Sequence, residues 1–391
     1  MIFKIALKNV LAAGVRTWLN TFILALTFTS IILLQGIYNG MMIQISENRI
    51  AEETGHSQIW HKNYDPFDPL SLEESHAEIP PGIDKAISRR EAIPVLMIFG
   101  SVYPHGQVFP AVLKGIPADQ KILALPFNAL MKKSPKGTLP GMIGKKMAKS
   151  TGLSMGDIIT VRWRNSKGAF NATDVSIVHI FNGKVPAMDS GQVWLKLKDL
   201  QTMNLSPGHA TIVISSKEAG SESLGGQWIQ KSLNDLLADT IALVKSKSTG
   251  ASFLYAILIF LSMIAIFDTQ ALSIFKRKKE IGTLMALGMT NGAIVRTFTI
   301  EGVLYGILAS IITLVCGGPL FYFLQTNGIT FPAPTEGYGL AMSNHIYPHY
   351  SLGLILGTFV IIMIILTIIS YLPARKITKL QPFEALRGKI S

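Results

Sequence analysis

The chain has 391 residues, of which 49% are hydrophobic and 15% are charged, and its formal net charge is +12. Water-soluble domains carry about 25% charged residues, so this composition excludes an ordinary soluble protein and indicates that much of the chain lies in lipid. The excess of Lys and Arg then indicates cytoplasmic loops of a membrane protein rather than a surface that binds nucleic acid.

Four stretches are long and apolar enough to cross a membrane, because a span of the hydrocarbon core needs about 20 apolar residues. The predicted spans are 18–40, 251–272, 293–325 and 351–372. The first apolar run is too long for a signal peptide and has no small-residue cleavage site directly after it, so we expect an uncleaved anchor.

The basic residues predict the orientation of these spans. Lys and Arg dominate in 1–17, in 273–292 and in the tail 373–391, whereas the loop 326–350 has neither. Because cytoplasmic loops collect Lys and Arg, both termini and 273–292 are expected in the cytoplasm, which leaves 41–250 and 326–350 outside.

The outer segment 41–250 has the pattern of an α+β domain. Four short, partly alternating stretches predict strands, namely DIITVRW, VSIVHIF, QVWLKL and ATIVIS. Residues 144–157 predict a short helix that ends at Gly152. Apolar spacing from Trp228 predicts a helix near 228–250, either a stalk that continues toward the second span or an ordinary domain helix with a linker. The single Cys316 cannot form an intrachain disulfide, so packing alone must hold this domain.

Sequence signatures of catalysis and cofactor binding are absent. The chain has no P-loop, no H-E-x-x-H, no C-x-x-C and no G-x-S-x-G. His345 and His349 are four residues apart but have no evident third ligand, so a metal site is not expected there. We therefore expect neither catalytic nor metal-binding residues.

The segment 273–292 lies between two predicted spans. It contains four consecutive basic residues, 276–279, which are followed by a predicted short apolar helix. One interpretation is an amphipathic helix that lies on the lipid surface. The other is a helix that docks into a groove of a soluble partner and transmits its motion. Gly288 and the residues that follow it would end this helix.

The stretch KRKKEIGTLMALGMTNGAIVRTFTIEGVLYGILAS resembles the signature of the FtsX-like permeases, the four-span membrane subunits of type VII ABC transporters. The tail YLPARKITKLQPFEALR resembles the ending of that family, and residues 1–17 resemble its amphipathic elbow helix. Glu301 matches an acidic residue common at the start of the third span. An acid there requires a partner, which we expect among the cytoplasmic basic residues unless Glu301 reaches the interface.

The resemblance implies a coupling helix that fits a groove of the ATPase subunit. Relatives often carry Lys or Arg where this chain has Met285. The ATPase-coupling residues carried over from the family are Glu280, Ile281, Gly282, Thr283, Leu284, Met285, Ala286, Leu287, Gly288, Met289, Arg375, Glu384 and Arg387.

The resemblance also implies the partners and the fold class. The chain itself is a transporter membrane subunit without enzymatic activity or cofactor, because ATP and Mg are bound by two copies of a partner ATPase. A second permease chain, identical or homologous, is expected, and no nucleic acid. The implied fold is an α-helical membrane protein with four transmembrane helices and a large α+β extracytoplasmic domain of the MacB-like periplasmic core type, in the inner membrane of a bacterium.

Within the family, GHSQIWHKNYD and GLSMGDIITVRW most resemble the lipoprotein-releasing (LolC/LolE) branch. That branch implies extraction of lipoproteins or other amphiphiles from the outer leaflet by mechanotransmission, with a periplasmic chaperone or adaptor. The segment 162–178 lacks the long proline-containing hook of the chaperone-recruiting subunit. MacB-like efflux and FtsX-like signalling to a periplasmic partner stay as alternatives.

The apolar faces of the first two spans are predicted to line the substrate cavity of such a permease. The alternative is that these faces contact lipid or pack a dimer. The residues chosen for the cavity are Leu24, Phe28, Ile31, Phe253, Ile257 and Phe260.

Overall fold

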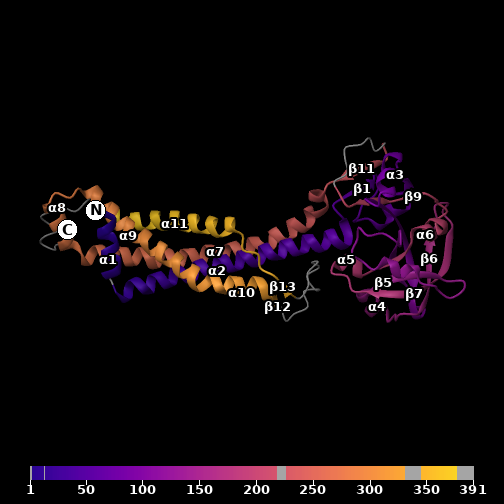
Figure 1. The fold of residues 1–391 in the computed structure, drawn as a ribbon, viewed down its shortest axis with the longest axis horizontal. Coiled ribbons are helices and arrows are strands. Elements are labelled where there is room, and N and C mark those ends of the chain that lie inside the picture. Colours follow the sequence, from indigo (N-terminus) through magenta and orange to yellow (C-terminus); the bar gives the residue numbers. More distant parts are fainter. Residues whose placement is uncertain (1, 13, 218–225, 331–344, 377–391) are drawn as a thin grey trace. The chain divides into compact units, whose positions relative to one another are not determined.

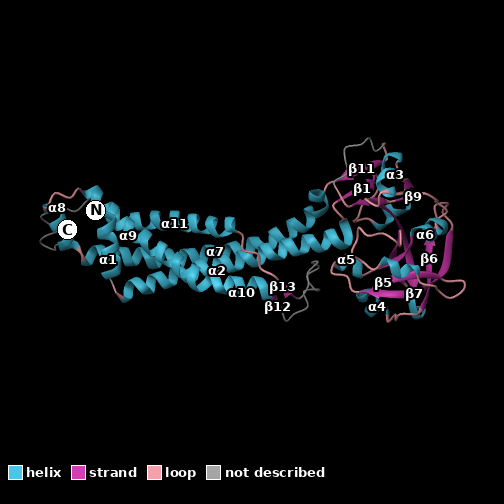
Figure 2. Cartoon of the chain, in the orientation of Figure 1, coloured by secondary structure: helices cyan, strands magenta, loops and turns pink. Residues whose placement is uncertain are grey.

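The computed structural model describes residues 2–12, 14–217, 226–330 and 345–376. The chain divides into a helical unit, residues 1–42, 243–330 and 345–391, and a sheet unit, which contains residues 43–242. The long helices gather in the first unit and most of the strands in the second (Figures 1 and 2).

The helical unit contains four helical segments that are long and apolar enough to cross a membrane, as predicted. Its elements are α1 (Ile2–Ala12), α2 (Val15–Arg49), α7 (Leu233–Lys276), α8 (Lys278–Ala286), α9 (Asn291–Ile312), the π-helix η6 (Thr313–Gly317), α10 (Gly318–Asn327), β12 (Ile329–Thr330), β13 (His345–Ile346) and α11 (Leu352–Ala374). Both α2 and α7 extend beyond this unit into the sheet unit.

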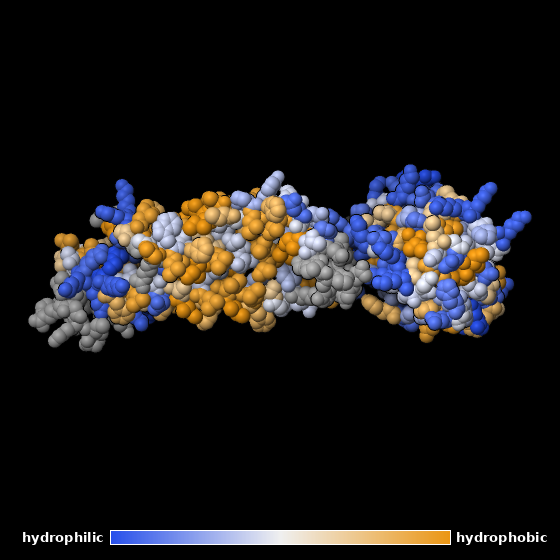
Figure 3. Space-filling view, turned by 90° about the horizontal axis from the view of Figure 1, so that it is seen from below, coloured by the Kyte–Doolittle hydropathy of each residue, from blue (hydrophilic) through white to orange (hydrophobic). Residues whose placement is uncertain are grey.

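The core of the helical unit is formed where α2, α9 and α11 meet. Leu24, Phe28 and Ile31 of α2 are buried there together with Leu304 of α9 and Leu366 of α11. Outside this core the exposed side chains of the helices are mostly hydrophobic (Figure 3), as expected of a surface whose solvent is lipid.

Small residues let α9 and α11 approach closely. A Cβ added at Gly302 would lie 1.8 Å from Oγ and 2.4 Å from Cβ of Ser370. At Gly306, a Cβ would lie 2.6 Å from a methyl group of Leu366. Small residues at such crossings are typical of membrane helices, whose association depends on close packing rather than on the hydrophobic effect.

The structure corrects the prediction for residues 228–250. Trp228–Lys231 is an edge strand, β11, which pairs antiparallel with β1 (Ser57–His61). The helix begins only at Leu233, because the backbone of residues 228–231 is extended and pairs with β1. From Leu233 the helix continues without a break to Lys276, so no linker separates it from the second span.

The sheet unit is an α+β structure with one large sheet. Its strands are β1, β2 (Ala77–Glu78), β3 (Ala92–Tyr103), β4 (Phe109–Ile116), β5 (Leu139–Gly144), β6 (Ile158–Arg164), β7 (Phe170–Phe181), β8 (Gln192–Lys196), β9 (His209–Ala210), β10 (Ile212–Ser215) and β11. Its helices are η1 (Ile50–Thr54), η2 (Pro69–Glu73), η3 (Pro81–Ile83), α3 (Asp84–Ser88), η4 (Pro104–Gly106), η5 (Phe127–Met131), α4 (Lys145–Thr151), α5 (Pro186–Asp189) and α6 (Leu197–Met203).

Nine strands within the described residues form the large sheet, in the order β11-β1-β10-β3-β4-β8-β5-β7-β6. An additional pairing of β3 with β6 closes the last six strands of this order into a ring. The long β3 makes this possible because its first residues pair with β10 and its later ones pair with both β4 and β6. Closing a sheet on itself removes exposed strand edges.

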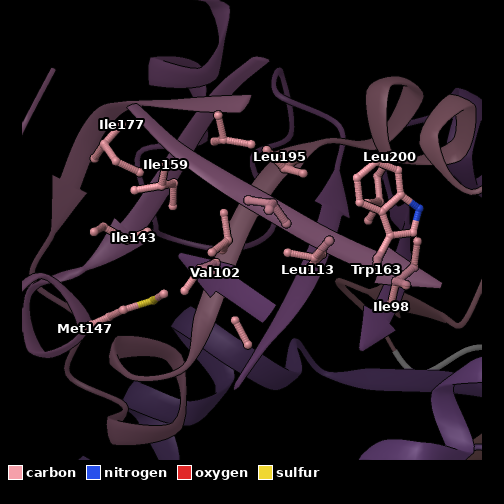
Figure 4. Packing of buried hydrophobic residues seen from close by; sticks show 14 of the residues in the cluster. Ile98, Val102, Leu113, Ile143, Met147, Ile159, Trp163, Ile177, Leu195 and Leu200 are labelled. Atoms are coloured by element: carbon pink, nitrogen blue, oxygen red, sulfur yellow. The ribbon is translucent and has the colours of Figure 1, made fainter. Parts of the chain in front are cut away.

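The interior of this ring is filled by hydrophobic side chains (Figure 4). Along β6, Ile159, Val161 and Trp163 point inward and alternate with exposed residues, so the sequence pattern matches one buried face. The Trp163 indole donates a hydrogen bond to the backbone oxygen of Met203 at 3.2 Å.

The predicted strands DIITVRW, VSIVHIF, QVWLKL and ATIVIS coincide with β6, β7, β8 and β9–β10. The predicted helix near 144–157 is α4, and Gly152 ends it in the left-handed conformation with φ of 70°. Cys316, the single cysteine of the chain, is exposed and lies in the helical unit. The sheet unit therefore has no cysteine and is packed without a disulfide.

We expect Trp163→Ala to destabilise the sheet unit by about 3–5 kcal/mol, because it leaves a cavity inside the closed ring. The matched control is Ile158→Ala, since Ile158 lies on the exposed face of the same strand. Thermal unfolding of the full chain in detergent, followed by circular dichroism, measures both. Equal effects of the two substitutions would contradict this account of the core.

We expect Gly302→Ala to cost about 1–3 kcal/mol, because its new methyl group collides with Ser370 across the α9–α11 crossing. The double variant Gly302→Ala/Ser370→Gly removes the colliding atoms and should regain most of this loss. The same unfolding assay tests both variants. Additive effects, with no recovery in the double variant, would show that the two positions do not pack against each other.

Candidate functional site

The helix α8 connects the second and third spans through two tight turns. It begins directly after Arg277, and its last turn ends at Leu287. The N–H of Gly288 donates to the oxygen of Met285, and the N–H of Met289 donates to that of Leu284, both at 3.0 Å. These two bonds form a Schellman motif, which needs a left-handed residue at Gly288, where φ is 89°.

The Thr290 side chain then caps α9 by accepting a hydrogen bond from the N–H of Ala293 at 3.3 Å. The end of α8 and the start of α9 therefore follow each other within four residues. Since both turns are closed by hydrogen bonds of the chain itself, the direction of α8 is determined by this short sequence.

The inner face of α8 packs against the helical unit. Ile281, Gly282 and Met285 are buried, and the first and third of them belong to a cluster with Ile274, Ile294, Val295, Phe298 and Ala374. Leu284 and Met289 pack against the same cluster. These five of the predicted coupling residues therefore attach α8 to its own chain rather than lying fully open to a partner.

The outer face of α8 is exposed. It carries Glu280, Thr283, Ala286, Leu287 and Gly288, and the side chain of Leu287 is 79% exposed. Exposed leucines are ordinary in lipid-facing helices, but this one caps the C-terminal end of the short helix that connects two spans. These five residues are the part of the predicted set that a soluble partner can reach.

Arg277 joins α8 to the spans through a buried ion pair. Its Nη1 donates to Oε1 of Glu301 at 2.9 Å and to Oε2 at 3.2 Å. Glu301 is 4% exposed and also accepts a hydrogen bond from Nδ2 of Asn9 at 2.7 Å. An acid so buried requires a charged partner, and the predicted basic partner of Glu301 is thus confirmed as Arg277.

The same guanidinium also binds the first turn of α8. Nε and Nη2 of Arg277 donate to the two carboxylate oxygens of Glu280, each at 2.8 Å. These bonds lower the pKa of Glu280 below its usual range and, together with the two acids, raise the pKa of Arg277. The planar guanidinium lies over the ring of Phe298 at 5.0 Å from its centroid.

This network links three elements that are far apart in sequence. Asn9 lies on α1, Arg277 immediately before α8, and Glu301 on α9. Ala6 and Val10 of α1 are also buried in the core of the helical unit. A displacement of α8 must therefore move α1 and α9 with it or break a buried, charge-assisted hydrogen bond.

The sequence did not reveal the roles of Asn9 and Arg277. Asn9 is separated from Glu301 by 292 positions, and an asparagine on an amphipathic helix carries no signal of a buried contact. Arg277 was one of four adjacent basic residues, and nothing local distinguished it from Lys276, Lys278 and Lys279.

Three predicted coupling residues lie in the tail. Arg375 is exposed at the end of α11, next to Ala374, which packs against the α8 cluster. Glu384 and Arg387 lie outside the described residues, so their predicted role stays a prediction.

The six residues predicted to form a substrate cavity are not brought together within the chain. Leu24, Phe28 and Ile31 pack in the core with α9 and α11. Phe253, Ile257 and Phe260 are exposed on α7. The apolar spacing of these six residues was compatible both with a cavity and with a core. Only the packing of α2 against α9 and α11 shows which of them are buried.

Among the residues that the structure describes, no group of three or more His, Cys, Asp or Glu could hold a metal ion.

Comparison with known proteins agrees with this geometry. The family described as FtsX-like permease C-terminal matches residues 252–382, which include α8, its ion pair and the last two spans. The ABC transporter permease YtrF of Bacillus subtilis is 28% identical over 141 residues, covering 36% of this chain and 32% of that protein. The uncharacterized ABC transporter permease MJ1507 of Methanocaldococcus jannaschii is 30% identical over 171 residues, covering 41% and 40%.

A macrolide export ATP-binding/permease protein MacB, from Sodalis glossinidius, is 31% identical over 136 residues, which cover 34% of this chain and 18% of that protein. The chain thus spans less than half the length of these curated relatives. Among solved structures, the extracellular domain of the noncanonic ABC-type transporter YknZ from Gram-positive bacteria covers 48% of this chain and 94% of that chain, at 14% identity and a TM-score of 0.26.

The matched family covers the helix, the turns and the buried Glu301 that the sequence had singled out, and the relatives bear the same permease description. Residues 252–382 are therefore similar to the C-terminal part of FtsX-like permeases, and the relatives that match the chain are described as ABC transporter permeases.

Proposed function

We propose that this chain is the membrane subunit of an ABC transporter of the mechanotransmission type, in which a separate cytoplasmic ATPase acts on α8. The observation that carries this proposal is the division of α8 into two faces. Its inner face and Arg277 fix it to α1 and α9, while its outer face, with Leu287, is open to a partner. A rigidly attached helix with a free face is what a push from outside requires.

Two long helices are available to carry that push to the sheet unit. In the helical unit, Asn20 of α2 donates to Thr269 of α7 at 2.9 Å, and Thr27 lies 2.6 Å from Ser262. In the sheet unit, Nη1 of Arg49 donates to Thr240. In each pair the two residue numbers add up to 289, so the antiparallel helices keep one register along their length.

The π-helix η1, which follows α2 directly, is tied to the loops of the sheet unit. The carboxylate of the buried Glu52 accepts hydrogen bonds from the N–H groups of Lys184 at 2.7 Å and Val185 at 3.2 Å. The oxygen of Ala51 accepts one from the N–H of Ala124 at 2.7 Å. A shift of α2 along its axis would therefore pull on the segments before α5 and η5.

For the substrate, we propose a lipoprotein or another amphiphile taken from the outer leaflet of a bacterial inner membrane, with both termini in the cytoplasm and the sheet unit in the periplasm. The resemblance of residues 55–65 and 152–163 to the lipoprotein-releasing branch supports this. An amphiphile needs no path through the membrane, so movement of the sheet unit outside the bilayer is sufficient.

MacB-like efflux is the second candidate, and the similarity to MacB sequences favours it.

The connection between β6 and β7 determines whether this chain could itself bind a periplasmic chaperone through a hook. Oδ1 of Asn165 accepts hydrogen bonds from the N–H groups of Lys167 and Ala169, both at 3.0 Å, which closes the hairpin as a tight turn. A chaperone hook therefore has no room there, so a chaperone would have to contact a second, different permease chain.

The exposed face of α7 supports pairing with a second permease chain. Phe253, Ile257 and Phe260 lie on it, among further exposed apolar residues of the second span. In a dimer this face would line the space between two chains, where the predicted substrate cavity would then be completed by the partner.

We expect Arg277→Gln to destabilise the helical unit by about 3–5 kcal/mol, because it leaves the Glu301 carboxylate buried without its charged partner. The double variant Arg277→Gln/Glu301→Gln removes both charges and should recover most of this stability. Thermal unfolding in detergent measures all variants. If the double variant is as unstable as the single one, the ion pair is not what holds α8 to α9.

We expect Leu287→Arg to reduce capture of an ABC ATPase by about tenfold without lowering the stability of the chain, because the Leu287 side chain is 79% exposed in the single chain. Pull-down from source membranes in mild detergent with mass spectrometry measures this. Leu11→Arg is the matched control, since Leu11 is an exposed leucine on α1.

Capture of the ATPase by the control but not by Leu287→Arg would support the docking of α8. Equal capture by both variants, or by neither variant nor the unmodified chain, would contradict it. The same samples separate the substrate classes: acylated proteins support the amphiphile proposal, and an adaptor protein supports MacB-like efflux.

A further inference from the structure

A cavity of about 490 Å³ lies within the helical unit between α2, the η6–α10 segment and α11. Phe28 and Ile32 of α2 form its floor and are both buried. Leu314 and Tyr322 border it on one side, and Leu356 on the other, and all three are exposed. The cavity is therefore a slot that reaches from the surface of the bundle down to the first span.

The slot is apolar except for a few oxygen-bearing side chains. Two of these are satisfied within the helices, since Ser310 donates to the oxygen of Ile307 at 2.7 Å and Thr313 donates to that of Ala25 at 3.1 Å. The hydroxyl of Tyr350 is buried and has no hydrogen-bond partner among the described residues. A buried polar group without a partner in the chain points to a ligand atom.

Burial raises the pKa of Tyr350 to about 12, so its phenol stays protonated and can donate a hydrogen bond at any physiological pH. The Tyr350 ring reaches its place because residue 36 of α2 is glycine: a Cβ there would lie 2.0 Å from Cε1 of the ring. The hydroxyl is therefore held at one side of the slot by the packing of α2.

The local backbone leaves the slot open. The π-helix η6 widens the third span just where it borders the cavity, and such insertions are frequent at functional sites. Gly318 also lines the slot, and a Cβ built at this glycine would have no atom within 4 Å. The cavity is therefore open because the helix is wider at η6 and because Gly318, which follows η6, has no side chain.

We propose that this slot binds one acyl chain of a membrane phospholipid, with the Tyr350 hydroxyl donating to an oxygen of the lipid's glycerol ester region. All three walls belong to candidate membrane spans or lie beside them, so alkyl chains are the solvent that surrounds the opening. The volume is in the range of small-ligand sites.

The slot shares Phe28 with the predicted substrate cavity, but no residue of α7 lines it. The proposal goes beyond the proposed function, because acyl-chain binding does not depend on any contact with an ATPase. A lipid in the slot would support the end of the third span against α2 and α11. It would thereby substitute for side-chain packing that the chain itself does not provide.

The test uses the full chain in nanodiscs of phosphatidylethanolamine and phosphatidylglycerol, with some phosphatidylethanolamine carrying a photoreactive diazirine in its acyl chain. After irradiation, mass spectrometry maps the labelled residues. Label on Phe28 or Ile32 is diagnostic, because these buried floor residues are closed to bulk lipid unless a chain enters the slot.

Gly318 lines the slot and a Cβ there would meet no atom within 4 Å, so the ring of Gly318→Phe should compete with an acyl chain and lower label on the floor about tenfold. The matched control is Gly357→Phe, which adds the same ring to an exposed position of α11 that does not line the slot and also meets no atom. It should leave the label unchanged. Tyr350→Phe should lower the floor label to a smaller extent, because it removes only the hydrogen bond.

Absence of label on the floor of the unmodified chain would overturn the proposal, as would equal label in the unmodified chain and Gly318→Phe. A loss of label in both glycine variants would also overturn it, because the effect would then not come from the slot. If the floor is unlabelled and oxidation joins two chains through the exposed Cys316, the neighbour at this face is a second copy rather than a lipid. Circular dichroism confirms that each variant is folded.

Discussion

The helical unit depends on one buried charge, the carboxylate of Glu301. In a medium that offers no water, this carboxylate must be paired within the protein, and Arg277 and Asn9 supply its partners. Since Arg277 also holds Glu280, the pairing determines where α8 lies relative to the spans. The apolar cluster that contains Ile281 and Met285 and the hydrogen-bonded turns at Gly288 and Thr290 hold the same helix, so the ion pair acts together with them to fix the direction of α8.

Beyond this anchor, the long helices distribute polar contacts sparsely but in a single register. Hydroxyl and amide side chains of α2 and α7 meet near the anchored end, again further along, and finally in the sheet unit. Each contact is weak by itself, and helices in lipid gain only modest energy from such bonds. Their value lies in excluding neighbouring registers, because a shift by one residue would break every pair. Two helices restricted in this way can move together as a unit, which suits the transmission proposed for this chain.

The sheet unit solves a different problem, since it must remain folded without a disulfide. Closing six strands into a ring by the β3–β6 pairing gives them a common interior, which Trp163, Leu113 and Val102 help to fill. Outside the ring, β10, β1 and β11 extend the sheet from β3, and β11 is its free edge. The chain passes from α2 through η1 into β1, and from β11 into α7, so both long helices continue into strands that pair with each other.

The sequence by itself determined the four candidate spans, the resemblance to FtsX-like permeases and the strands β6, β7, β8 and β9–β10, because these depend on patterns that are local. The other strands, among them the long β3, were not predicted from the sequence. Runs of apolar residues, alternation along β6 to β8 and the capping glycines can each be recognised within a short window. The family resemblance likewise rests on consecutive residues, from Lys276 onward. Only the tertiary structure decided which faces of these elements are buried. It placed Leu24 and Ile31 in the core while leaving Phe253 exposed, although all three lie in equally apolar helices. It also showed that Arg277, one of four adjacent basic residues, and Asn9, 292 positions away in the sequence, are the partners of Glu301. Such a buried contact depends on distance and direction in space, which a sequence pattern does not contain.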